Sequence, residues 1–100
     1  MEIKKEAYAG TQESSDVLVL VRPNEGRGIK IDLESVVKTT FGSQILTTVR
    51  KVCSEMGVTD AYLELRDKGA IDCVIRARVE AAVCRAAEVR FDWEGETCHG

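Results

Sequence analysis

The sequence predicts a single small α+β domain, in which an antiparallel sheet carries two helices on one face. The chain has 100 residues, the usual size of one domain. Short runs typical of strands flank a long segment whose apolar residues recur at helical spacing. In chain order these elements follow a ferredoxin-like βαββαβ plan preceded by an extra N-terminal strand. The domain is expected to span residues 1–94, and residues 95–100 are expected to form a flexible C-terminal tail.

Five strands are expected before the second helix begins, and four of them lie before residue 67. Val17–Val21 (VLVLV) is wholly apolar, which is typical of a strand buried on both faces. Ile29–Asp32 alternates between apolar and polar residues, and Asn24–Gly28 (NEGRG) between them has the composition of a turn. These two runs are therefore predicted to form a hairpin. Residues 3–9 are expected to add another strand beside this hairpin, and Ala61–Arg66 alternates as a further one.

The longest helix is predicted between residues 33 and 56. Asp32 is the expected N-cap, Glu34 would complement the positive end of the helix dipole, and Gly57 would end the helix. Gly42 interrupts the pattern and could mark a kink, a split into two helices or a close approach of another backbone. Eight apolar residues form the stripe at mostly three- and four-residue steps: Leu33, Val36, Val37, Phe41, Ile45, Val49, Val52 and Met56.

The second half of the chain leaves one assignment open. Asp67–Gly69 has the composition of a tight turn. Residues 71–76 then fit a strand that pairs back on the preceding one, but they also fit a helix capped by Asp72. The strand is favoured here, followed by a helix from about Ile75 to Glu88. The alternation over Val89–Trp93 predicts a closing strand.

Composition argues against several classes of protein. A formal net charge of −3 gives no basic face for phosphates, so nucleic acid is not expected as a partner. No run approaches the roughly 20 apolar residues of a membrane span, and the N-terminus lacks the apolar core of a secretory signal. A cytoplasmic location is therefore expected. Cys53, Cys73, Cys84 and Cys98 are widely spaced, and with His99 they do not match a metal site; they predict three buried thiols and one exposed one.

No catalytic constellation stands out among the side chains. The only histidine lies next to the C-terminus, and the glycine motifs that bind phosphates are absent. The carboxylates are expected to be solvated. Arg76, Arg78, Arg85 and Arg90 predict a solvated helix face, or alternatively a contact with a phosphate or an acidic partner. The chain is therefore not expected to be an enzyme, which leaves binding, scaffolding or carrying.

The stretch GTQESSDV places two adjacent hydroxyls, Ser14 and Ser15, between Glu13 and Asp16 in a predicted loop. The residue types alone fit an ordinary polar turn, and they also fit a chemical handle that another enzyme can reach. The two acids could be recognition marks for a modifying enzyme, or they could keep the loop in water. Asp16 could also cap the turn by accepting a hydrogen bond from its own backbone.

The sequence resembles the acyl carrier (gamma) subunits of citrate lyase. The resemblance is carried by AGTQESSDV (Ala9–Val17), by the FG pair at Phe41-Gly42, by DKGAIDCVIRARVEAA (Asp67–Ala82), and by the total length. It implies a phosphoprotein in which Ser14 is joined through a phosphodiester to 2'-(5''-phosphoribosyl)-3'-dephospho-coenzyme A. Ser15 is the fallback for this covalent attachment. The cysteines play no part in this function, because the working thiol belongs to the prosthetic group.

The resemblance also implies partners and a reaction cycle in citrate fermentation. A prosthetic-group transferase attaches the arm. A transferase (alpha) subunit exchanges acetyl for citrate on its thiol and releases acetate, and a lyase (beta) subunit cleaves the citryl thioester to oxaloacetate and regenerates the acetyl thioester. The carrier itself catalyses neither step. Two alternatives stay open: a malonate decarboxylase-type acyl carrier, and an unmodified protein–protein interaction module in which Ser14 is only a turn residue. Docking of the arm against Arg76, Arg78 or Arg85 is a hypothesis that rests on charge alone.

Overall fold

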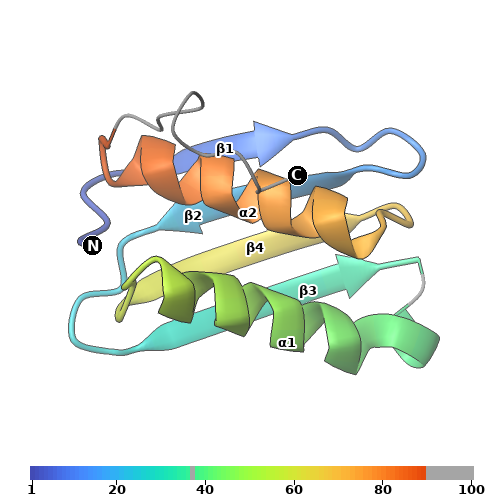
Figure 1. The fold of residues 1–100 in the computed structure, drawn as a ribbon, viewed down its shortest axis with the longest axis horizontal. Helices are drawn as coiled ribbons and strands as arrows, with labels where there is room; N and C mark the ends of the chain where they lie inside the picture. Colours follow the sequence, from blue (N-terminus) through green and yellow to red (C-terminus); the bar gives the residue numbers. More distant parts are fainter. Residues whose placement is uncertain (37, 90–100) are drawn as a thin grey trace.

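The computed structural model describes residues 1–36 and 38–89, and it places two helices on one face of a four-stranded sheet (Figure 1). This arrangement confirms the α+β class and the placement of both helices on one face of the sheet. The elements in chain order are β1 (Ala7–Gly10), β2 (Val17–Arg22), β3 (Ile29–Ser35), α1 (Lys38–Glu55), β4 (Ala61–Asp67) and α2 (Asp72–Ala86).

The sheet is mixed, which corrects the prediction of an antiparallel sheet. Its order is β1-β2-β4-β3, with β2 antiparallel to both neighbours and β3 parallel to β4. The predicted hairpin between β2 and β3 is wrong, because β4 lies between them. The β3–α1–β4 segment is a strand–helix–strand crossover, which pairs its two strands in parallel. The other edge of β4 then pairs with β2, so that Leu63 lies beside Val21 and Leu65 beside Val19.

The ferredoxin-like βαββαβ plan is also wrong, because no strand separates β4 from α2. The helix begins at Asp72, so the interpretation that was not favoured at residues 71–76 is the correct one. Ile75, Val79 and Val83 recur every four residues and are buried, which a helix lying on the sheet achieves and a short strand would not. The predicted closing strand begins at Val89, which is exposed and in no strand, and its other residues lie outside the described part of the chain.

The helix α1 begins later than its apolar stripe suggested. Leu33 is buried in β3, where Asp32 also lies, so Asp32 is not the N-cap and Glu34 is not in the first helical turn. The alternation of β3 continues to Ser35, which pairs with Asp67 of β4. These residues therefore belong to the sheet, and the helix begins only after them. The helix runs through Gly42 as one element. Its end is as predicted: Gly57 has a φ of +73° and the Val58 N–H donates to the Cys53 carbonyl.

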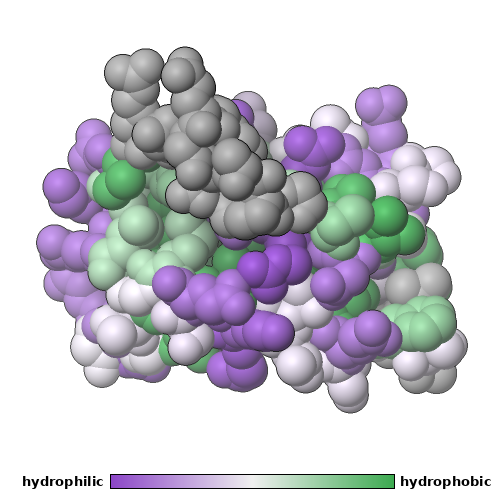
Figure 2. Space-filling model, in the orientation of Figure 1, coloured by the Kyte–Doolittle hydropathy of each residue, from purple (hydrophilic) through white to green (hydrophobic). Residues whose placement is uncertain are grey.

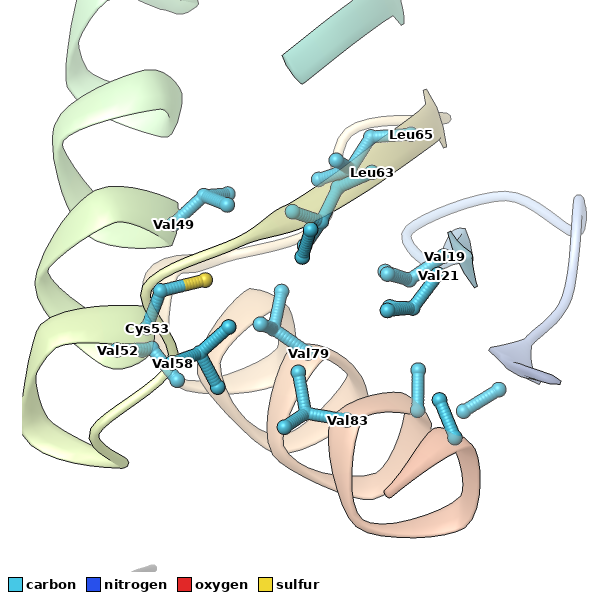
Figure 3. Packing of buried hydrophobic residues seen from close by; sticks show 14 of the residues in the cluster. Val19, Val21, Val49, Val52, Cys53, Val58, Leu63, Leu65, Val79 and Val83 are labelled. Carbon is cyan, nitrogen blue, oxygen red and sulfur yellow. The ribbon is translucent and has the colours of Figure 1, made fainter. Parts of the chain in front are cut away.

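The core lies between the sheet and the two helices and is built mainly of valine, with alanine, leucine and isoleucine (Figure 3). Along β2, Val17, Val19 and Val21 are fully buried beneath the helices, whereas Leu18 and Leu20 on the opposite face are half-buried. The prediction that this strand is buried on both faces is therefore wrong for its outer face. Burial of each such side chain contributes about 1.5–3 kcal/mol to the free energy of folding. This packed layer therefore stabilises the sheet, including the end from which the loops described next emerge.

Candidate functional site

The serine pair lies at the tip of the loop between β1 and β2. The four residues Glu13–Asp16 form a turn, in which the Asp16 N–H donates to the Glu13 carbonyl at 3.1 Å. Ser15, the third residue of the turn, has a φ of +67°, whereas Ser14 keeps a negative φ. This pattern is that of a type II turn, whose third position usually holds glycine. Both serines are exposed, as the sequence predicted for a loop that another enzyme can reach.

Asp16 holds this turn to the rest of the protein. Its carboxylate accepts hydrogen bonds from the Thr11 hydroxyl and the Val17 N–H, each at 2.7 Å. Arg78 of α2 donates to both carboxylate oxygens, from Nε at 3.0 Å and from Nη2 at 3.2 Å. The hydrogen bond from Arg78 is the largest cause that lowers the pKa of Asp16, from its ordinary 3.8 to about 2. Of the roles considered for this acid, capping the turn is the one that the structure shows.

Gly10 lets the loop fold back closely at its base. It has a φ of +91°, and a Cβ at this position would lie 1.9 Å from the Val17 carbonyl oxygen. The same Cβ would lie 3.2 Å from Cδ of Arg78, the side chain that reaches Asp16. Any residue other than glycine would therefore force β1 and β2 apart at the point where the loop is anchored.

A second loop, between β4 and α2, is bonded directly to the serine turn. The Ser15 N–H donates to the Lys68 carbonyl at 2.8 Å, and the Lys68 N–H donates to the Asp16 carbonyl at 2.9 Å. Because β2 and β4 are antiparallel, with Val17 beside Asp67, the two loops emerge at the same end of the sheet. The two longer segments that carry the family resemblance, Ala9–Val17 and Asp67–Ala82, are thus bonded to each other.

The base of this second loop is held by the buried carboxylate of Asp67, which is only 2% exposed. It accepts hydrogen bonds from the Ser35 hydroxyl at 2.7 Å, from the Gly69 N–H at 3.2 Å and from the Ala70 N–H at 2.9 Å. Three donors compensate for the loss of water around this charge. The carboxylate thereby fixes the end of β3 and the start of the loop relative to each other.

The two serines differ in what holds them. Ser15 is anchored through its backbone N–H and occupies a left-handed conformation. The Ser14 hydroxyl makes no hydrogen bond to any of the described residues and is open to solvent at the apex of the turn. The arrangement offers a serine oxygen that an external enzyme can approach without first breaking a contact. Among the described residues, no base lies within hydrogen-bonding distance of this hydroxyl.

The described arginines of this group keep part of their surface in solvent, and each also makes a structural contact. Arg76 pairs with Glu55 of α1 at 2.7 Å, Arg78 pairs with Asp16, and Arg85 donates to the Tyr8 carbonyl of β1 at 2.8 Å. Each one ties α2 to a different element. Arg90 lies outside the described residues. The pairing of Arg78 with Asp16 was not predicted, although both residues belong to the segments that carry the resemblance.

The described part of the chain covers residues 1–36 and 38–89. No group of three or more histidine, cysteine, aspartate or glutamate side chains in this part of the chain is placed to hold a metal ion. No helix there has both the length and the apolar character needed to cross a membrane.

Comparison with known proteins finds a matching family. The family described as "ACP: Malonate decarboxylase delta subunit (MdcD)" matches residues 4–86. The citrate lyase acyl carrier protein of Clostridium perfringens is 50% identical over 98% of both chains. That of Escherichia fergusonii is 52% identical over 88% of this chain and 91% of its own, and that of Streptococcus equi subsp. equi is 45% identical over 94% and 93%.

A solved structure shares the fold. One chain of a malonate decarboxylase hetero-tetramer from Pseudomonas, crystallised with malonate, superposes with a TM-score of 0.73 over 84% of this chain and 86% of its own. Its sequence is 22% identical, so this likeness supports the fold. The curated relatives are far closer in sequence and cover nearly the whole chain. The chain therefore belongs to the citrate lyase acyl carrier protein family, whose members are non-catalytic carrier subunits.

Proposed function

We propose that this chain is the acyl carrier subunit of a citrate lyase and that Ser14 is the attachment site of its prosthetic group. The observation that carries the proposal is the position of the Ser14 hydroxyl. It is exposed and makes no hydrogen bond to the described residues, at the apex of a turn braced by Asp16, Arg78 and Lys68. A serine in this setting can attack an activated phosphate presented by a transferase, form a phosphodiester and release the leaving group to solvent.

The residues present fit a large covalent group such as 2'-(5''-phosphoribosyl)-3'-dephospho-coenzyme A. The turn projects from the end of the sheet, so an attached arm displaces no buried side chain. Its base is fixed by the two-pronged Asp16–Arg78 pair and by the Ser15–Lys68 hydrogen bond. When bound, the arm supplies a terminal thiol that holds an acyl group. A mobile arm on a fixed base raises the effective concentration of that group at two active sites.

The partners that follow are the transferase (alpha) and lyase (beta) subunits and a prosthetic-group transferase, in the cytoplasm. The modifying transferase must recognise the loop without disrupting the contacts that hold its base. Asp16 is committed to Arg78, whereas the side chain of Glu13 is exposed beside Ser14. Glu13 is therefore the acid of this loop that is available for contact with the transferase. Lys68, also exposed, adds a positive charge on the neighbouring loop.

A malonate decarboxylase-type carrier is the second candidate. The description of the matching family and the origin of the structural neighbour both favour it. The sequence favours citrate lyase, because the relatives at 45–52% identity carry that name and the malonate decarboxylase chain is 22% identical. An unmodified interaction module is the third candidate, in which the exposed serines serve only as turn residues.

Reconstitution with the alpha and beta subunits and the transferase of the same host tests the proposal. The unaltered chain and Ser15→Ala are expected to support citrate cleavage, and Ser14→Ala is expected to reduce it to background. Activity of Ser14→Ala would contradict the assignment, and loss in Ser15→Ala alone would move the site by one residue. Malonate-dependent but not citrate-dependent turnover would favour the second candidate.

A further inference from the structure

An apolar cleft lies at the same end of the molecule as the serine turn. Its volume is about 320 Å³, and its walls come from the first half of α1 and from the loop and first turn that lead into α2. Phe41 and Ile71 border it and are 49% and 66% exposed, so two large apolar side chains face solvent at the same cleft. Figure 2 shows hydrophobic surface gathered where both helices begin.

The cleft is close to Ser14. The Ser15 N–H lies 2.8 Å from the Lys68 carbonyl oxygen, and the next residue, Gly69, is part of the cleft wall. Standard covalent geometry then places Cα of Ser14 within about 8 Å of Cα of Gly69. A group joined to Ser14 by a short linker can therefore reach this cleft without any change in the backbone.

The cleft suits one planar, partly polar ring system. Its volume is at the lower end of the roughly 300–1,000 Å³ of small-molecule sites, which is too small for a whole coenzyme arm. Phe41, Ile71 and Ile75 supply apolar and aromatic surface, while Gln44 adds an amide. Asp72 adds a carboxylate, of which Oδ1 already accepts a hydrogen bond from the Thr48 hydroxyl. An aromatic face for stacking, with hydrogen-bonding groups beside it, is the composition that recognises a purine.

We propose that this cleft binds the adenine ring of the prosthetic group, an inference that rests on the proposed function. In that group the phosphoribosyl unit joins the serine oxygen to the adenosine, so adenine is the planar group nearest to Ser14. The diphosphate and pantetheine parts lie farther along the arm and stay outside the cleft. The adenosine is then held against the carrier, while the distal thiol remains free to move between partner subunits.

This assignment replaces docking on the arginines. Arg76, Arg78 and Arg85 are each engaged by a carboxylate or a carbonyl of another element. The charges of Arg76 and Arg78 are therefore matched by carboxylates, and the Arg85 guanidinium is held by a backbone carbonyl. The cleft residues, in contrast, are large apolar side chains that gain by being covered.

The test compares the unmodified and modified full-length protein by NMR after intact-mass measurement has verified the modification. We expect the methyl resonances of Ile71 and Ile75 to shift upfield on modification, with cross-relaxation between adenine protons and the Phe41 ring. The methyl resonances of Leu18 and Leu20, on the opposite face of the sheet, are expected to stay unchanged.

Phe41→Ala is the variant that weakens the cleft, and Tyr8→Ala, which removes an aromatic ring 63% exposed on β1, is the matched control. In Phe41→Ala the modification-dependent shifts at Ile71 are expected to vanish, while Tyr8→Ala keeps them. Three results with the correct mass would overturn the adenine assignment: no shift at the cleft, shifts at Leu18 and Leu20, or cleft shifts that need an added partner subunit. None of these results would contradict the carrier role. Absence of the added mass would instead refute the proposed function.

Discussion

Replacing Asp16 with asparagine tests whether the serine loop is held in place electrostatically. Asparagine has nearly the same shape and can still accept a hydrogen bond from the Val17 N–H through its Oδ1. Its amide nitrogen cannot accept from Thr11 or Arg78, so the two-pronged pair with Arg78 is lost. The variant therefore removes the charge while leaving the volume of the loop unchanged.

The magnitude follows from the lowered pKa of Asp16. A drop from 3.8 to about 2, at 1.36 kcal/mol for each pKa unit, sets an upper value of about 2.4 kcal/mol. The side chain of Asp16 is 15% exposed but that of Arg78 is 42% exposed, so solvent screens part of the interaction. We expect Asp16→Asn to lower the free energy of unfolding by about 1.5 kcal/mol at pH 7.

The pH dependence has a defined sign. Because the pKa is lower in the folded protein, the unfolded chain takes up the proton first as the pH falls. The contribution of Asp16 is thus fully present above its ordinary pKa of 3.8 and is lost as the pH falls through about 2. Urea unfolding at several pH values should show the difference between the unaltered chain and Asp16→Asn constant near neutrality and shrinking in this acidic range.

The control is Glu13→Gln, which removes a carboxylate from the same loop where its side chain is exposed. A change of less than about 0.5 kcal/mol is expected for it at every pH. A double-mutant cycle with Arg78→Gln should give a coupling of about 1 kcal/mol with Asp16. If Asp16→Asn is as stable as the unaltered chain, or if its deficit persists undiminished at pH 2, the electrostatic account of the loop is wrong.

Three further outcomes are expected. Gly10→Ala should cost at least about 3 kcal/mol in urea unfolding, because its Cβ would meet the Val17 carbonyl oxygen at 1.9 Å; a cost below 1 kcal/mol would show that the loop can open. Ser15→Gly should raise the free energy of unfolding by about 0.5–1 kcal/mol, since glycine adopts the φ of +67° without strain; a decrease would refute the turn assignment. Peptide mapping after brief thiol labelling at pH 8 should find the exposed Cys73 modified and Cys53 untouched, because burial raises the pKa of Cys53 to about 11; equal labelling would contradict that burial.

Secondary structure could be predicted from the sequence where the local residue pattern matches the burial seen in the fold. The alternation of β4 and the left-handed glycine after α1 both predicted what the structure shows. The start of α1 was misplaced because Leu33 fits a helical stripe as well as it fits the alternation of a strand. Sheet pairing of β3 with β4 settles the choice, and that pairing joins residues about 32 positions apart, which no local pattern contains.

The same limit applies to the second half of the fold. Residues 71–76 fit both periods, and the deciding factors are tertiary: Asp67 fixes the loop, and the Thr48 hydroxyl of α1 donates to Asp72 at 2.5 Å. The order of the strands could not be predicted for a related reason. Proximity along the chain favoured a hairpin of β2 with β3, whereas β4 inserts between them and pairs with both. Cys84 is buried and Cys73 exposed, although spacing alone does not distinguish them.

The candidate site could likewise be predicted only in part from the sequence. The exposed serines could be located from residue types, and the resemblance singled out Ser14. The contacts that hold the turn could not be predicted, because Arg78 lies 62 residues from Asp16 in the sequence. The only hint of these contacts in the sequence is that Asp16 and Arg78 belong to the two longer segments that carry the resemblance, and the fold brings these segments side by side.

The most direct test of the central claim is the intact mass of the protein purified from its native host during growth on citrate, followed by peptide mapping across residues 10–22. The account predicts an added mass equal to one phosphoribosyl-dephospho-coenzyme A unit, located on Ser14 and absent from Ser14→Ala. An unmodified chain from cells that are consuming citrate would contradict it.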